Sequence, residues 1–137
     1  MLKSISGMCP TVLTYVPGLR LARVRVIFEL PSQYGRLPHP LLYVEWYTPF
    51  HRVDNVSQML MVSRSTRNLV PNAEVLTADR LVALCHLAGK AGAHISHDWT
   101  SENVLDVAET FFVNPYLSVD VFSGSKSLYS RSRGVVE

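Results

Sequence analysis

Four side chains that can bind a metal gather in one short stretch of this sequence, at Cys85, His86, His94 and His97. Zinc prefers such nitrogen and sulfur ligands. The spacing argues against a zinc site, because adjacent Cys and His side chains seldom ligate one ion together and no Cys-x-x-Cys or His-Glu-x-x-His signature accompanies them. We therefore expect no metal and no cofactor, with Cys85 as a core thiol and the histidines in turns or at the surface.

Nucleophiles and carboxylates are present, but their sequence surroundings are not those that activate them. Ser63, Ser65 and Thr100 lie outside any Gly-x-Ser-x-Gly elbow. Glu29 and Glu45 fall on neighbouring strand candidates, where carboxylates opposite arginines form ion pairs more often than an acid–base dyad. The glycines are scattered singly, so no phosphate-binding loop is predicted. The sequence thus predicts a protein that is not an enzyme.

Charge is the strongest functional signal, because the chain is polarised. Residues 1–68 carry eight Lys or Arg against three acids, a net +5, and residues 69–137 carry five against eight, a net −3. Arginine, whose planar fork suits phosphate and whose plane stacks on bases, accounts for most of the cations. The candidate nucleic-acid-binding residues are Arg23, Arg25, Arg36, Arg52, Arg64 and Arg67, with Arg20 on the same strand as the first two, beside Tyr43 and Tyr47. The alternative is an ordinary solvated face whose arginines pair with acids.

These side chains must be positioned by short strands. Residues 41–48 alternate apolar and polar side chains, as do residues 21–30, where Val24, Val26, Phe28 and Leu30 are predicted to share one face. Further strands are expected at 11–16, 59–64, 73–77 and 117–121, and the segment 81–88 favours a strand or one helical turn followed by a strand.

The clearest helix pattern lies late in the chain. Thr100 is placed as an N-cap, and Leu105, Ala108, Phe111 and Phe112 form an apolar stripe, so a helix is expected over 101–113. The predicted core comprises Val24, Val26, Phe28, Val44, Trp46, Met61, Leu105, Phe111 and Phe112. Short strands with one late helix predict a mainly β fold, a small SH3-like or OB-like barrel of about five or six strands closed by that helix.

Length and composition are those of one globular domain. We expect a partly ordered lead-in over 1–19, a β-rich domain over 20–122 and a disordered, basic, Ser-rich tail over 123–137. No stretch approaches the roughly 18 apolar residues of a membrane span, so no membrane association is expected. The two cysteines imply no disulfide framework and favour an intracellular, reducing compartment.

Several sequence strings resemble a known module. They are ARVRVIF at 22–28, YVEWYTPF at 43–50, MVSRS at 61–65, CHL at 85–87, WTSENVLD at 99–106 and TFFVN at 110–114. Over roughly residues 20–122 the chain resembles a module of mushroom-type fungi, the C-terminal region of large transposon-associated proteins of basidiomycetes. The loop at 31–40 is shorter here and a small-residue stretch occupies 88–93, which are departures from that module.

The resemblance implies a transposon-derived fragment or domesticated copy with nuclear, nucleic-acid-associated biology. It transfers no catalytic residue, because a transposase's acidic residues would belong to a separate nuclease domain. The expected function is therefore non-catalytic DNA or RNA binding by the arginine-rich face. The alternative is a protein-interaction module that offers a peptide groove, a sheet edge or a surface for self-association.

Overall fold

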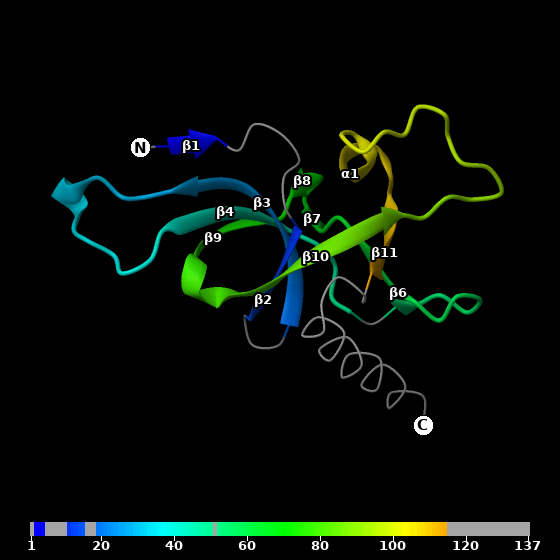
Figure 1. The fold of residues 1–137 in the computed structure, drawn as a ribbon, viewed down its shortest axis with the longest axis horizontal. Helices are drawn as coiled ribbons and strands as arrows, with labels where there is room; N and C mark the ends of the chain where they lie inside the picture. Colours follow the sequence, from blue (N-terminus) through cyan, green and yellow to red (C-terminus); the bar gives the residue numbers. More distant parts are fainter. Residues whose placement is uncertain (1, 5–10, 16–18, 51, 115–137) are drawn as a thin grey trace, which may run out of the picture.

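The computed structural model describes residues 2–4, 11–15, 19–50 and 52–114, and strands dominate them (Figure 1). In chain order the elements are β1 (Leu2–Ser4), β2 (Thr11–Tyr15), β3 (Leu19–Phe28), the 3-10 turn η1 (Ser32–Tyr34), β4 (Leu41–Trp46), β5 (Arg52–Val53), β6 (Leu60–Ser63), β7 (Thr66–Arg67), β8 (Val70–Pro71), β9 (Ala73–Thr77), the 3-10 turn η2 (Ala78–Arg80), β10 (Leu81–Gly89), α1 (Val104–Val107) and β11 (Thr110–Asn114). The expected mainly β fold is confirmed.

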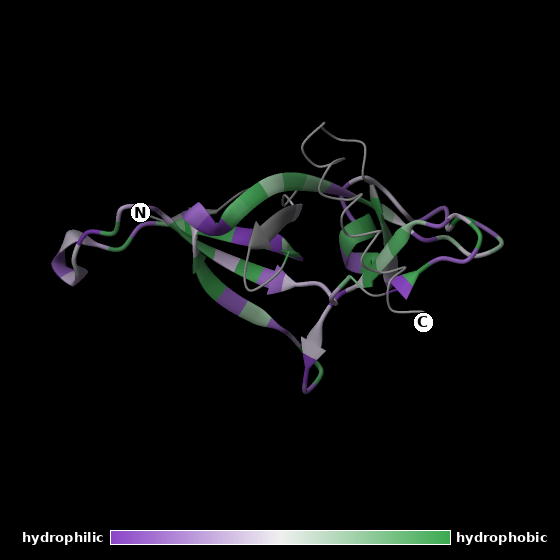
Figure 2. Cartoon of the chain, turned by 90° about the horizontal axis from the view of Figure 1, so that it is seen from below, coloured by the Kyte–Doolittle hydropathy of each residue, from purple (hydrophilic) through white to green (hydrophobic). Residues whose placement is uncertain are grey.

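Within the described residues, every strand pairing is antiparallel. The large sheet has the order β5-β6-β11-β10-β2-β3-β4-β9 with β1 beside β3, and β7 and β8 form a separate hairpin. Figure 2 shows apolar and polar residues alternating along the curved strands. In the described part of the chain, the strand order does not close into the expected barrel, because β5 and β9 lie at its two ends and do not pair with each other. One isolated bridge, between Tyr47 and Arg64, connects the end of β4 to the residue that follows β6.

Most of the expected strands are present. The segments predicted at 11–16, 21–30, 41–48, 59–64 and 73–77 become β2, β3, β4, β6 and β9. The segment 81–88 lies entirely within β10, and the turn η2 precedes it. The strand expected at 117–121 and the tail at 123–137 lie outside the described residues. No helix in the described part of the chain is long and apolar enough to span a bilayer.

The long helix predicted over 101–113 is wrong. Thr100 does cap a turn, since its Oγ1 accepts a hydrogen bond from the Asn103 N–H at 3.2 Å, but α1 is only four residues long and ends in the extended Ala108. The remaining residues form β11, which pairs with β10 on one side and β6 on the other. Phe111 and Val113 are buried and Phe112 is half-buried. This alternation suits a strand, and the two flanking strands satisfy its backbone hydrogen bonds.

A β-bulge in β3 changes which side chains enter the core. The register with β4 shifts between Val24 and Val26, so Arg25 is the additional residue. A bulge moves the following side chains to the opposite face of the strand. Val26, Ile27 and Phe28 are all half-buried. Of the three, Ile27 packs against the buried core, whereas Val26 and Phe28, which the alternation placed beside Val24, do not belong to it.

The described residues form two core clusters. The Tyr47 cluster is made of Leu21, Tyr47, Leu60, Val62, Cys85, Leu87, Leu105, Ala108, Phe111 and Val113. The Trp46 cluster is made of Ala22, Val24, Leu42, Val44, Trp46 and Leu76. Neighbouring residues of β3 enter different clusters, and so do Trp46 and Tyr47, because successive side chains of a strand point to opposite faces.

Substitution of Phe111 and of Phe112 tests whether residues 110–114 form a strand. Phe111 is 0% exposed and packs edge-to-face on Tyr47, with ring centroids 5.8 Å apart, whereas Phe112 lies half-buried beneath Lys90. We expect Phe111→Ala to lower the free energy of unfolding by about 3–5 kcal/mol and Phe112→Ala by clearly less. Urea unfolding of both variants measures the difference, and an equal or larger loss for Phe112→Ala would contradict the strand orientation.

Candidate functional site: an arginine-lined hollow and an open sheet edge

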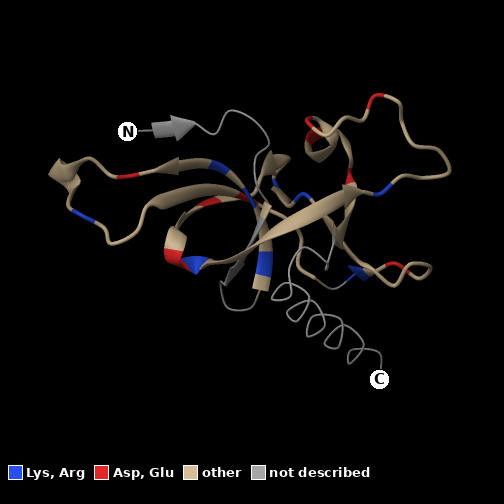
Figure 3. Ribbon diagram, viewed as in Figure 1, with Lys and Arg blue, Asp and Glu red and all other residues tan. Residues whose placement is uncertain are grey.

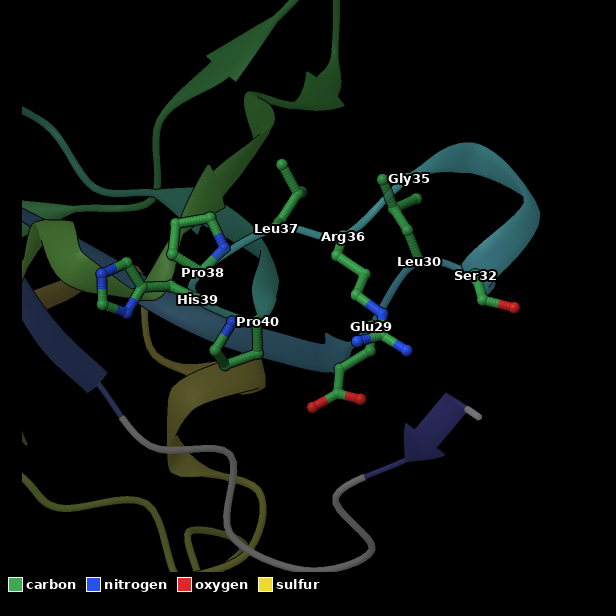
Figure 4. A pocket seen from close by; sticks show the side chains of 9 residues that line it. All are labelled: Glu29, Leu30, Ser32, Gly35, Arg36, Leu37, Pro38, His39 and Pro40. Atoms are coloured by element: carbon green, nitrogen blue, oxygen red, sulfur yellow. The ribbon is translucent and has the colours of Figure 1, made fainter.

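The basic residues are spread over several elements of the fold (Figure 3). Arg23, Arg25 and Arg64 line one hollow, whereas Arg52 lies exposed on β5 and Arg67 lies exposed on β7. Arg36 belongs to the Pro-rich loop between β3 and β4, where it lines a separate hollow of about 420 Å³. Figure 4 shows the Arg36 side chain extending toward Glu29 within that loop.

The hollow that gathers three arginines is called the arginine hollow here. Its volume is about 340 Å³, and residues of β3 and β4, of the β7–β8 hairpin and of α1 line it. The ionisable side chains of the lining are Arg23, Arg25, Glu45, Tyr47, Arg64 and Asp106, and its apolar side chains include Trp46, Leu69 and Pro71. β3 and β4 provide much of its polar lining because Arg23 and Glu45 are register partners.

Each arginine of this hollow has an internal partner. Arg23 is buried and holds Asp106 through two nitrogens, with Nη1 2.6 Å from Oδ1 and Nη2 3.5 Å from Oδ2. Arg25 lies 3.7 Å from Glu45, measured from Nε to Oε1. The Arg64 Nη1 donates to the backbone carbonyl of Asp106. The hydrogen bond from Arg23 holds the Asp106 carboxyl pKa below its ordinary value, although burial opposes this shift.

The two predicted tyrosines have different surroundings. Tyr47 is 1% exposed, so its ring is not available for stacking on a base. Its hydroxyl has no hydrogen-bond partner within the described residues. Burial raises the pKa of this hydroxyl to about 12, while the charges of Arg23 and Arg64 oppose the rise. Tyr43 is partly exposed on the outer face of the sheet, opposite Val75 of β9.

Arg20 packs on aromatic carbon and does not line the hollow. Its guanidinium carbon lies 4.7 Å from the centre of the Trp46 ring, and its Nε donates to the Tyr47 carbonyl at 3.3 Å. The Trp46 Nε1 donates in turn to Glu74 at 3.2 Å. These contacts attach the Arg20 side chain to the end of β4.

Asp106 and Leu69 are among the residues of the arginine hollow that sequence reasoning missed. Asn68 and Leu69 form the turn of the β7–β8 hairpin, and both have positive φ, 53° and 64°. Tight hairpins require this conformation, which Asn tolerates and Leu does not favour. Leu69 is 98% exposed. The Asn-x pair between two short strands was the available signal for the turn, whereas nothing local predicts a contact between Asp106 and Arg23.

Strand β9 forms an open edge of the large sheet. Trp46 N–H donates to the Asn72 carbonyl, and Ala78 N–H donates to the Pro40 carbonyl. Hydrogen-bonded pairs alternate along an antiparallel ladder, so the same register assigns Glu74 and Leu76 to bonds with β4. The backbone groups of Ala73, Val75 and Thr77 therefore point away from β4. No strand pairs with this side of β9 among the described residues.

Exposed apolar side chains occur near this edge and on β10. Val75 is 49% exposed beside Tyr43. Val82 and Leu84 are exposed on β10. These side chains provide apolar surface of the kind that protein partners cover.

The histidines and Cys85 do not come together. His86, His94 and His97 are exposed, whereas the Cys85 thiol is buried in the Tyr47 cluster and burial raises its pKa to about 11. In the part of the chain that the structure describes, no three Cys, His, Asp or Glu side chains gather as metal ligands would.

Comparison with known proteins gives no family model, no curated protein and no solved structure that matches this chain. The resemblance to transposon-associated proteins and the expected nuclear location thus stay predictions.

The ion pair between Arg23 and Asp106 predicts a pH dependence of stability. A carboxyl whose pKa is lowered by folding stabilises the protein above its unfolded-state pKa, near 3.9, and loses that contribution as the pH falls through the folded-state value. We expect Asp106→Asn to be less stable than the natural protein at pH 7, modestly, because the Asp106 side chain is 55% exposed. This difference in unfolding free energy between the two proteins should shrink as the pH falls below about 4.

Urea unfolding at several pH values measures this difference, with Asp98→Asn in the exposed loop as the control. A difference of the same size at pH 7 and pH 3 would show that the Asp106 charge is not what stabilises the contact.

Proposed function

We propose that this domain is a protein-interaction module, and that it self-associates by pairing the β9 edges of two copies into one continuous sheet. The observation that carries this proposal is the row of backbone donors and acceptors at Ala73, Val75 and Thr77. Strand addition at such an edge is a common mode of recognition, because the backbone provides affinity and alternate side chains provide specificity.

The sequence of β9 is complementary to itself. In an antiparallel pair centred on Val75, each Val75 bonds with its equivalent, and each Ala73 bonds with Thr77 of the other copy. The only charged residue of the strand, Glu74, then stands opposite Leu76 and not opposite a second Glu74. Neither Lys nor Pro occurs within β9, although both are common on edges that avoid pairing. A two-fold symmetric contact of this kind uses the same surface on both copies.

Nucleic-acid binding is the second candidate. The convergence of Arg23, Arg25 and Arg64 favours it. It is the weaker candidate because Arg23 and Arg25 lie against carboxylates and the Tyr47 ring is buried. Phosphate binding would have to compete with these internal partners.

We also propose that the large sheet closes into a small barrel. Thr48 N–H donates to the Ser63 carbonyl at 2.8 Å, and Ser65 N–H donates to the Trp46 carbonyl at 2.8 Å. With the bridge between Tyr47 and Arg64, these bonds support a barrel-like closure through β6, β11, β10, β2, β3 and β4. Strand β9 would then remain outside the closure as the free edge.

Val75→Pro tests self-association. The Val75 N–H points away from β4, so proline removes a donor needed between copies while the bonds between β4 and β9 remain. By sedimentation we expect the natural protein to be a dimer at high concentration and Val75→Pro to be a monomer with nearly unchanged thermal stability. Val75→Thr, which keeps the N–H and the branched shape, should still dimerise.

Salt separates the two candidates. A dimer joined by backbone bonds and apolar side chains should change little between low and high salt, whereas nucleic-acid binding through several arginines should weaken steeply. A protein that stays monomeric at all concentrations, or dimers that survive in Val75→Pro, would contradict the edge proposal. Salt-sensitive oligonucleotide binding that is lost in Arg25→Gln would favour the second candidate.

A further inference from the structure

The arginine hollow carries an excess of one positive charge. Three guanidinium groups, those of Arg23, Arg25 and Arg64, stand against the carboxylates of Glu45 and Asp106. Asp106 is the ion-pair partner of Arg23, and Arg64 reaches only its backbone carbonyl. Within the described residues, Arg64 has no carboxylate at ion-pair distance. The hollow therefore has one guanidinium charge that a bound anion would complement.

The Tyr47 hydroxyl is a second reason to expect a ligand. Tyr47 belongs to the lining of the hollow. Its hydroxyl is buried and has no hydrogen-bond partner among the described residues. A buried hydroxyl without a hydrogen bond lowers the stability of the folded protein, so its presence requires an explanation. Its electrostatic neighbours are Arg23, Arg64, Glu45 and Asp106. An oxygen of a bound anion would accept a hydrogen bond from this hydroxyl.

The third reason is the strained rim of the hollow. Leu69 holds φ at 64°, a conformation that a leucine adopts at a cost, and nearly all of its side chain is exposed. Such strain tends to occur at functional sites. Together with Pro71 and Trp46, the Leu69 side chain gives the hollow an apolar side next to the arginines. A ligand with an apolar body would cover Leu69.

We infer that the arginine hollow binds a small organic carboxylate, with Arg64 and the Tyr47 hydroxyl on the carboxylate and Leu69 with Pro71 against the apolar body. The single negative charge matches the excess charge, whereas a phosphate dianion would exceed it and would be repelled by Glu45 and Asp106. The volume of about 340 Å³ lies at the small end of ligand sites. This inference does not depend on self-association at β9.

Calorimetric titration of the full chain with benzoate tests the inference, because benzoate joins one carboxylate to a compact apolar ring. We expect saturable binding of benzoate and no comparable binding of benzamide, which has the same shape without the charge. Tyr47→Phe should weaken benzoate binding about tenfold while the fold is kept, since it removes one hydrogen bond to a charged group. Arg64→Gln should weaken binding further, and Arg36→Gln, on the distant loop, should have no effect.

Leu69→Gly separates binding from folding. Glycine adopts positive φ freely, so this variant should be at least as stable as the natural protein and should nevertheless bind benzoate more weakly. N-acetylphenylalanine, which imitates the end of a peptide, distinguishes the two sources of a carboxylate. Tighter binding than benzoate indicates a chain terminus, and weaker binding indicates a free small acid.

The inference is overturned if benzoate does not bind, if benzamide binds equally well, or if inorganic phosphate binds more tightly than benzoate at equal ionic strength. Unchanged benzoate affinity in both Tyr47→Phe and Arg64→Gln would also overturn it, because binding would then take place elsewhere.

Discussion

The fold depends on the end of β4, where two neighbouring side chains belong to different parts of the core. Trp46 is buried in one cluster and Tyr47 in the other. Alternation along a strand requires this separation, so both clusters must form if residues 46 and 47 are to be buried. The backbone here joins distant segments through the bonds Trp46 N–H to Asn72 O, Tyr47 N–H to Leu21 O, Thr48 N–H to Ser63 O and Ser65 N–H to Trp46 O, at 2.8–3.0 Å. Both candidate sites are built from this junction, since β9 continues from Asn72 and the arginine hollow includes Tyr47.

The strands were predictable because their signal is local. Alternation at 41–48 and 21–24, and proline or polar residues between segments, are enough to indicate most of the sheet. The C-terminal half of the predicted helix was not predictable in this way. Leu105, Ala108 and Phe112 fit helical spacing, yet Phe111 and Val113 also fit a strand. The choice is made by β6 and β10, which lie far away in the sequence and pair with both sides of β11. The bulge at Arg25 is likewise invisible in the sequence, because it depends on the register with β4.

The candidate sites were predicted less completely than the fold. Residue types identified Arg23, Arg25 and Arg64 as a group, and the structure brings them together with Tyr47. The sequence could not indicate that Arg23 pairs with Asp106, which is 83 positions away. This pairing lowers the capacity of Arg23 to bind phosphate, since an arginine held by a carboxylate is less available to another anion. The open edge of β9 follows from strand order, which no pattern within Ala73–Thr77 specifies.

Amide hydrogen exchange at the end of β4 tests the central claim, that residues 46–48 couple the two clusters into one cooperative unit. The account predicts that the amides of Trp46, Tyr47, Thr48 and Ser65 exchange only by global unfolding, with the same free energy as the most protected amides of β3 and β10. Exchange of these four amides by local opening, with β3 and β10 still protected, would contradict it.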